Sequence, residues 1–227
     1  MSVTPGKFGE VLKSLILKQH YDLQISKTAP IIIAERITDL ISLVLIAAVG
    51  TLSFQTGGLV LVLTSSFLII LVFILSHKKL FKFLIQKFSK VKFLSKYLEQ
   101  FVNIHESFWT LLTMKNIIFM SLLSIVAWFF ECFSFYLVLT KFDSNITLNL
   151  SSFIYSFSTI VGSMLLLPGG LGGTEGSMTL LLLKKGFTKD AAITSIMLIR
   201  LATLWFAVIV GFFSFTFYQK VKGKISL

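Results

Sequence analysis

Four stretches of this chain are apolar over about 20 residues or more, which is the length that an α-helix needs to cross a lipid bilayer. They cover residues 31–54, 57–76, 117–139 and 191–217, and a fifth stretch, 150–167, is close to the lower limit. Hydrophobic residues make up 55% of the 227 positions and charged residues only 14%. Because so few polar residues cannot cover a water-soluble surface, we predict an all-α, polytopic bundle of membrane helices.

The fifth apolar stretch ends in a glycine cluster that is typical of a helix break, Pro168-Gly169-Gly170-Leu171-Gly172-Gly173-Thr174-Glu175. The apolar residues that follow, 176–183, are too few to span a bilayer before Lys184 and Lys185. We therefore expect residues 150–187 to form a re-entrant or broken helix. Lipid tolerates such a break only where protein or a wet cavity shields the backbone.

Lysines gather between the second and third spans, in residues 77–116. They occupy positions 78, 79, 82, 87, 90, 92, 96 and 115, beside an apolar face that recurs every three or four residues. The positive-inside rule places this segment in the cytoplasm. It forms either an amphipathic helix on the inner leaflet or an ordinary solvated linker helix. The net charge of +11 thus favours membrane orientation and contact with anionic headgroups over nucleic-acid binding.

The C-terminal tail, residues 218–227, is also basic and is also expected in the cytoplasm. The sequence therefore predicts a multi-pass protein of the cell membrane with both basic segments inside. Counting spans back from these two segments, residues 31–54 start inside and residues 191–217 start outside. These two spans are expected to run antiparallel.

Two distant segments share the order proline, glycine, second glycine, glutamate. They are Pro5-Gly6-Lys7-Phe8-Gly9-Glu10 and residues 168–175. Glu10 lies 26 positions before Arg36 (36 − 10), and Glu175 lies 25 positions before Arg200 (200 − 175), where each arginine opens an apolar span. Since those spans run antiparallel, we predict an inverted repeat with the substrate site at its interface near the membrane midplane. The alternative is two unrelated turns, with both arginines snorkelling to the membrane surface.

Charged side chains within the spans are the candidates for function, because each costs about 2.5–3.5 kcal/mol at the centre of a membrane helix. Arg36 and Asp39 are three positions apart and can pair. Arg200 needs a counter-ion from elsewhere, either Glu175, Glu10, Glu131 or a lipid phosphate. A guanidinium suits phosphate because it donates two parallel hydrogen bonds. The candidate lipid-binding residues are Pro5, Gly6, Lys7, Gly9, Glu10, Arg36, Asp39, Pro168, Gly169, Gly170, Gly172, Gly173, Glu175 and Arg200.

Other kinds of site find little support in the sequence. The histidines are scattered and Cys132 is the single cysteine, so neither a metal site nor a cofactor is expected. The glycine cluster lacks the Gly-Lys-Ser/Thr of a nucleotide loop. Glu131 is either a proton or cation site or the partner of a polar group in the bundle. Trp109, Trp128 and Trp205 are interpreted as interfacial or packing aromatics.

Three segments carry a family resemblance: residues 4–13, residues 34–39 and residues 168–177. In their content and order the chain resembles the lysylphosphatidylglycerol synthase transmembrane family, also called flippase-like domain proteins. The resemblance implies a domain like the N-terminal flippase of the multiple peptide resistance factor, which moves aminoacylated phosphatidylglycerol between leaflets. Relatives without a synthase domain belong to polyprenyl-lipid, glycolipid or hopanoid pathways. We expect two departures from this family. Spans ahead of the first Pro-Gly motif are expected to be missing, as in an N-terminally truncated or short form, and the aminoacyl-transferase domain is expected to be absent.

The expected function is to bind a phosphate-bearing lipid, of the aminoacyl-phosphatidylglycerol or polyprenyl or glycolipid type, and to move it between leaflets. Residues 1–227 are expected to form one domain, in which residues 1–30 hold the first Pro-Gly motif and a half-helix. The alternative is a non-catalytic scaffold that partners a lipid-modifying glycosyltransferase or synthase. An enzyme that acts on lipid is the third hypothesis. It ranks last because the sequence offers no evident nucleophile with an adjacent base.

Overall fold

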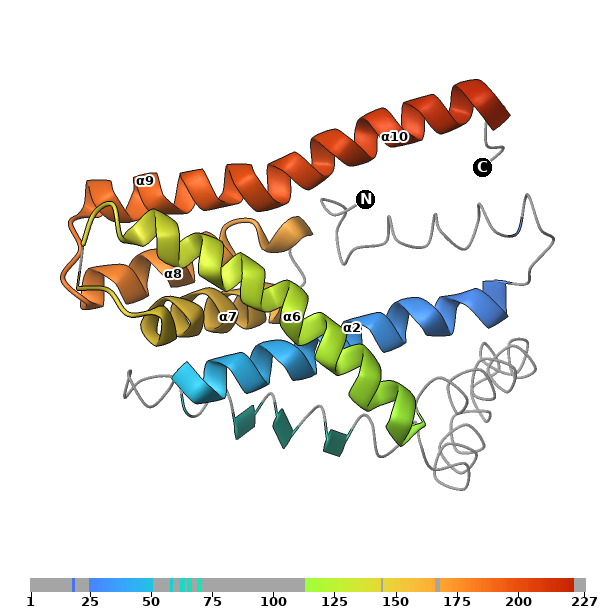
Figure 1. The fold of residues 1–227 in the computed structure, drawn as a ribbon, viewed down its shortest axis with the longest axis horizontal. Coiled ribbons are helices and arrows are strands. Elements are labelled where there is room, and N and C mark those ends of the chain that lie inside the picture. Colours follow the sequence, from blue (N-terminus) through green and yellow to red (C-terminus); the bar gives the residue numbers. More distant parts are fainter. Residues whose placement is uncertain are drawn as a thin grey trace, which may run out of the picture.

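The computed structural model describes residues 25–50, 113–143, 145–165 and 168–222, together with positions 18, 58, 62–63, 65–66 and 69–70. Its helices are α2 (Ile25–Gly50), α6 (Met114–Leu139), α7 (Leu148–Met164), η4 (Pro168–Gly170), α8 (Gly173–Lys184), α9 (Lys189–Arg200), η5 (Leu201–Trp205) and α10 (Phe206–Lys222). These described ranges contain helices and turns and no strand. The predicted all-α fold is confirmed (Figure 1).

Two helices of the described part are long and apolar enough to cross a membrane. They are Lys115–Leu139 in α6, with 25 residues, and the continuous helix Lys189–Lys220, with 32 residues. At 1.5 Å per residue the shorter is about 37 Å long, which exceeds the hydrocarbon core of about 30 Å. The predicted spans 117–139 and 191–217 fall inside them. Of the predicted span 57–76, the structure describes positions 58, 62–63, 65–66 and 69–70, all of them helical.

Helix α2 begins at Ile25, ahead of the expected start near residue 31, and includes Pro30. A proline removes one backbone hydrogen bond, which at Pro30 is the bond to the carbonyl of residue 26 in the first turn of α2. The helix continues through Pro30, and membrane helices tolerate such a residue. In Figure 1, α2 runs opposite to the continuous helix α9–η5–α10, as expected for these two spans.

Helices α7 and α8 form a hairpin whose outer ends lie at the same end of the molecule (Figure 1). Their 17 and 12 residues correspond to about 26 Å and 18 Å, so neither helix matches the thickness of a bilayer. The turn between them contains Gly169, Gly170 and Gly172, with φ angles of 62°, 68° and 83°. These left-handed conformations favour glycine, so the glycine cluster is what allows the chain to reverse here.

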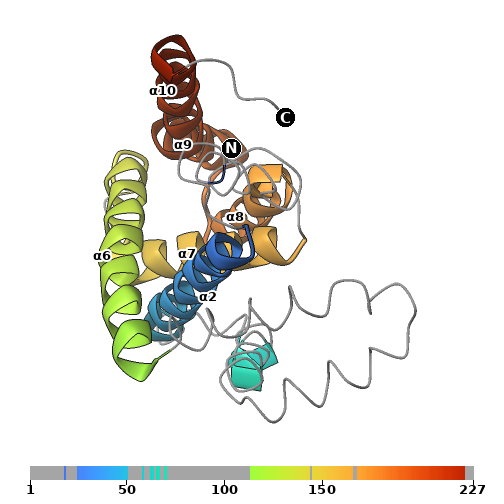
Figure 2. The same cartoon turned by 90° about the vertical axis from the view of Figure 1, so that its right-hand side faces the viewer.

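Helix α7 lies at the centre of the bundle and packs against α2, α6 and α8 (Figure 2). The core holds the fully buried side chains of Phe135, Phe153, Ile160, Met178 and Leu182. The faces of α6 and α10 that point away from this core are apolar and exposed. Four of their phenylalanines are more than 60% accessible: Phe119, Phe130, Phe212 and Phe217. Exposed apolar surface of this extent needs lipid around it, which agrees with a membrane bundle.

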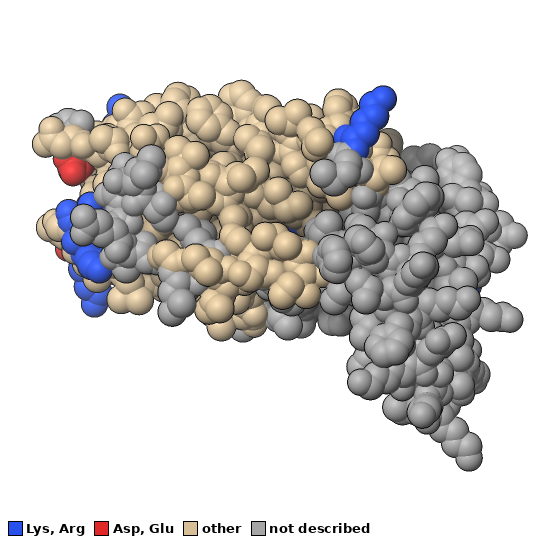
Figure 3. Space-filling view, turned by 90° about the horizontal axis from the view of Figure 1, so that it is seen from below, with Lys and Arg blue, Asp and Glu red and all other residues tan. Residues whose placement is uncertain are grey.

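On the face drawn in Figure 3, most exposed charged side chains of the described residues gather at one end. Figure 3 shows lysines at the end where the α6–α7 and α8–α9 turns meet. The exposed lysines of these turns are Lys141, Lys184, Lys185 and Lys189. The long sides of the helices between the two ends are covered by uncharged residues, so this face carries the pattern expected of a protein embedded in lipid.

Candidate functional site

Arg200 lies at the tip of the α7–α8 hairpin, at the last position of α9. Its Nε donates to Oε1 of Glu175 at 2.5 Å, and its second guanidinium nitrogen, Nη2, donates to the carbonyl oxygen of Gly169 at 3.3 Å. The Arg200 side chain is only 13% exposed. Among the described residues considered as counter-ions from the sequence, Glu175 is the one that the structure pairs with Arg200; Glu10 lies outside the described residues. The ion pair joins α9 to the start of α8 and to the hairpin turn.

Glu175 also closes the N-terminus of α8. Its Oε2 accepts a hydrogen bond from the backbone N–H of Gly172 at 2.7 Å. A glutamate three residues after the helix cap often makes this contact, since the first N–H groups of a helix have no partner inside it. The negative carboxylate is also favoured by the positive end of the helix dipole. One carboxylate thus binds a guanidinium and a helix N-terminus together.

The glycines of the turn make room for this arrangement. A methyl group on Gly170 would lie 2.6 Å from the Thr174 hydroxyl oxygen and 3.7 Å from Nη2 of Arg200. Gly170 also has a positive φ, so a side chain at this position would be strained as well as crowded. The turn therefore lets the backbone approach Arg200 closely.

Arg200 is followed directly by η5, a π-helical segment from Leu201 to Trp205. Such segments are rare, and inside α-helices they are frequent at functional sites. Nothing in the apolar sequence Leu201–Trp205 indicates this irregularity, so sequence reasoning did not find it. The π-helical segment therefore lies directly beside Arg200 within the long C-terminal helix.

A second charged cluster lies on α2. Nη1 of Arg36 contacts Oδ2 of Asp39 at 3.0 Å, and Nη2 lies 3.9 Å from Oε1 of Glu35. The predicted pairing of Arg36 with Asp39 is therefore confirmed. The side chains of these two residues are 31% and 21% exposed, so this cluster is more accessible than Arg200.

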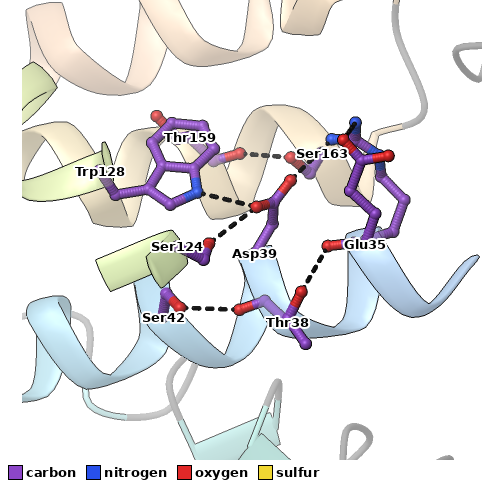
Figure 4. A network of polar contacts seen from close by, with 9 residues as sticks. Glu35, Thr38, Asp39, Ser42, Ser124, Trp128, Thr159 and Ser163 are labelled. Carbon is purple, nitrogen blue, oxygen red and sulfur yellow. Dashed lines mark hydrogen bonds and ion pairs between the residues drawn. The ribbon is translucent and has the colours of Figure 1, made fainter. Parts of the chain in front are cut away.

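Asp39 is also bound from the neighbouring helix α6 (Figure 4). Its Oδ1 accepts from the Ser124 hydroxyl at 2.8 Å and from the Trp128 indole N–H at 3.3 Å. Trp128 was interpreted as an interfacial or packing aromatic, and the structure adds this polar contact. Thr159 and Ser163 of α7 lie beside the cluster in Figure 4, where Ser163 donates to the Thr159 carbonyl at 2.8 Å.

Glu131 of α6 is bound from the neighbouring helix α7. It accepts a hydrogen bond from the hydroxyl of Tyr155 at 2.6 Å, which joins α6 to α7. Tyr155 is only 3% exposed. Pairing with a polar group of the bundle was one of the two alternatives for Glu131, and the structure supplies that partner. Sequence reasoning did not single out Tyr155, because an aromatic residue in an apolar helix gives no sign of where its hydroxyl points.

The structure thus assembles two groups of the predicted site residues. The hairpin-tip site consists of Gly169, Gly170, Gly172, Glu175 and Arg200. Pro168 begins η4 in the same turn, and Gly173 is the first residue of α8. Arg36 and Asp39 form the α2 cluster. Both groups border α7, on which Gly162 touches Thr174 of α8 and Thr159 faces the side of α2. The residues of the first motif, Pro5, Gly6, Lys7, Gly9 and Glu10, lie outside the described residues.

Comparison with known proteins identifies the family of this chain. The sequence model of the lysylphosphatidylglycerol synthase TM region matches residues 1–211. The chain belongs to this family. The match includes both Pro-Gly motifs and both arginines, so all candidate residues lie within the family's region, and membership supports a location in the membrane.

Two relatives of this lysylphosphatidylglycerol synthase TM family member are UPF0104 membrane proteins of archaea. The protein of Methanocaldococcus jannaschii is 25% identical and aligns over 96% of this chain and 94% of its own length. The protein of Methanothermobacter thermautotrophicus is 26% identical over 49% of this chain and 35% of its own length. No solved structure matches the chain.

Proposed function

We propose that this protein binds the phosphate headgroup of a membrane lipid at the hairpin tip and carries the lipid between the two leaflets. The observation that carries the proposal is Arg200, a guanidinium that is only 13% exposed and lies against a glycine turn and a helix N-terminus. A buried arginine in a membrane protein is costly and marks a functional site by default.

Phosphate is the ligand class that these donors fit. A guanidinium offers parallel N–H groups that match two phosphate oxygens. The backbone N–H groups at the start of α8 and the positive end of its dipole favour an anion at the same place. The apolar outer faces of α6 and α10 would hold the acyl or polyprenyl chains, while the headgroup reaches the hairpin tip.

Transport between leaflets is supported by the antiparallel course of α2 and α9–α10 and by an arginine–carboxylate pair on each side of α7. In an inverted repeat, the two halves expose the site in turn to each side of the membrane. We propose that the α7–α8 hairpin is re-entrant and that the C-terminal end of α10 faces the cytoplasm. The lysine-rich segment 77–116 would then lie on the same side.

The test is transbilayer movement of fluorescent lipids in proteoliposomes that contain the purified protein. Phosphatidylglycerol and a polyprenyl phosphate should be tried first, with wild type, Arg200→Gln and Lys189→Gln. Lys189 is exposed at the helix end, so its variant loses the same charge outside the site and serves as the control. Movement that survives in Lys189→Gln and is lost in Arg200→Gln is expected.

The opposite result has a clear meaning too. If no lipid moves with any well-inserted protein, or if Arg200→Gln moves lipid as fast as the wild type, the transport proposal is wrong. The scaffold role for a separate lipid-modifying enzyme would then take its place, and a pull-down from membranes with the same variants would be the next measurement.

A further inference from the structure

We propose that Glu175 is an internal ligand of the anion site, and that a lipid phosphate binds Arg200 by displacing this carboxylate. The inference rests on the proposed function, because it concerns how the headgroup gains access to Arg200. It adds a regulatory step, since the site is closed by the protein's own anion until a lipid competes for it.

The position of the Glu175 carboxylate is the first argument. One oxygen binds Nε of Arg200 at 2.5 Å, and the other accepts from the N–H of Gly172 at 2.7 Å. These are the two kinds of donor that an incoming anion would use, a guanidinium and a helix N-terminus. Two oxygens of a phosphate can take the same two hydrogen bonds. The carboxylate therefore occupies the place of the ligand.

Accessibility gives the second argument. The Glu175 side chain is 27% exposed, whereas that of Arg200 is 13% exposed. The carboxylate is thus the more accessible partner of the pair, and we infer that a headgroup approaching from outside the bundle meets it first. Glu175 lies in the first turn of α8, and its neighbours Thr174 and Met178 remain buried in the core. Rotation of the Glu175 side chain alone would open the site without moving α8.

The third argument is that Arg200 has an anchor which does not depend on Glu175. Its Nη2 donates to the carbonyl of Gly169 at 3.3 Å. This contact would keep the guanidinium at the hairpin tip after the carboxylate has left. Displacement of Glu175 would also release the N–H of Gly172, which can then donate a hydrogen bond to a phosphate oxygen.

Asp39 in the α2 cluster is built differently and serves as the matched comparison. It accepts hydrogen bonds from Arg36, Ser124 and Trp128, which come from two helices. A carboxylate held by three side chains loses more hydrogen bonds when it moves than one held by Arg200 and a single backbone N–H. Of these two carboxylates, Glu175 is therefore the one that acts as a displaceable ligand.

The experiment is equilibrium dialysis of the detergent-purified full chain with dihexanoyl phosphatidylglycerol, a water-soluble lipid that carries the phosphate. Wild type, Glu175→Gln, Asp39→Asn and Arg200→Gln are compared. We expect Glu175→Gln to bind about tenfold more tightly than the wild type, because the competing charge is removed while the shape of the side chain is kept. Asp39→Asn should bind no more tightly than the wild type, and Arg200→Gln should not bind.

Each other outcome decides something. If Glu175 served only as a helix cap and counter-ion, Glu175→Gln would bind equally or more weakly, while wild-type binding still required Arg200; this result would overturn the inference alone. If none of the variants bound the lipid, or if Arg200→Gln bound as well as the wild type, the proposed phosphate site itself would fail. If Glu175→Gln did not fold, Glu175→Asp would replace it, since the shorter side chain withdraws the carboxylate and should strengthen binding by a smaller factor.

Discussion

Gly162 of α7 and Thr174 of α8 pack so closely that a methyl group on Gly162 would overlap the Thr174 hydroxyl oxygen. The backbone nitrogen of Thr174 would be 3.2 Å away, so rotation of the threonine side chain alone does not make enough room. This contact joins the two helices of the hairpin just below the turn that holds Arg200.

We therefore predict that Gly162→Ala destabilises the protein, by about 1–3 kcal/mol as is usual for an overpacked core. Gly176→Ala on α8 is the control, because nothing lies within 4 Å of a methyl group there, and alanine favours a helix by about 1 kcal/mol over glycine. Thermal unfolding in detergent should show a lower melting temperature for Gly162→Ala only. Equal melting temperatures would mean that α7 and α8 are less tightly packed than the structure indicates.

A second prediction concerns Trp128, whose indole N–H donates to Asp39. Trp128→Phe keeps an aromatic ring but loses this contact between α6 and α2, and we expect a loss of about 1–2 kcal/mol for a hydrogen bond to a charged group. Trp205→Phe is the matched control, since Trp205 is 42% exposed on the long C-terminal helix. Unfolding measurements should find Trp205→Phe close to the wild type. A similar loss in both variants would contradict a specific role of the Asp39 contact.

Tyr155 supports a third prediction. Tyr155→Phe removes the hydroxyl that donates to Glu131 and retains the ring beside Phe135, whose centroid is 5.7 Å away. We expect destabilisation by about 1.5–3 kcal/mol, because a half-buried charged acceptor loses a donor. Tyr136→Phe is the control, since the half-buried Tyr136 ring lies against Phe133 and this ring contact is kept. The prediction is wrong if both tyrosine variants unfold at the wild-type temperature.

Ser158 gives a prediction of the opposite sign. Its side chain is fully buried, and its hydroxyl oxygen has no hydrogen-bond partner among the described residues. A buried polar group without a partner costs about 1–3 kcal/mol, so Ser158→Ala should leave the stability unchanged or raise it. Ser42→Ala should lower it, because the Ser42 hydroxyl binds the carbonyls of Thr38 at 2.8 Å and of Ser121 at 3.0 Å. A clear loss of stability in Ser158→Ala would show that its hydroxyl has a partner after all.

Local features of the fold could be predicted from the sequence because they depend on neighbours along the chain. The two long apolar helices follow from their composition, and the break at residues 168–173 follows from proline and glycine chemistry. The Arg36–Asp39 pair follows from a spacing of three positions, which places both side chains on one face of any helix. The start of α2 at Ile25 was missed, because the span 31–54 was set by its apolar residues and the helix also includes the polar residues 26–28 ahead of them.

Contacts between helices were decided only by the tertiary structure. The sequence alone left Glu175, Glu10, Glu131 and a lipid phosphate as partners of Arg200, and the fold pairs Arg200 with Glu175. It likewise brings Ser124 and Trp128 to Asp39 and Tyr155 to Glu131, none of which the spacing along the chain predicts. The physical reason is that periodicity determines which face of a helix is polar, whereas its partner depends on the rotation and register of each helix against its neighbours.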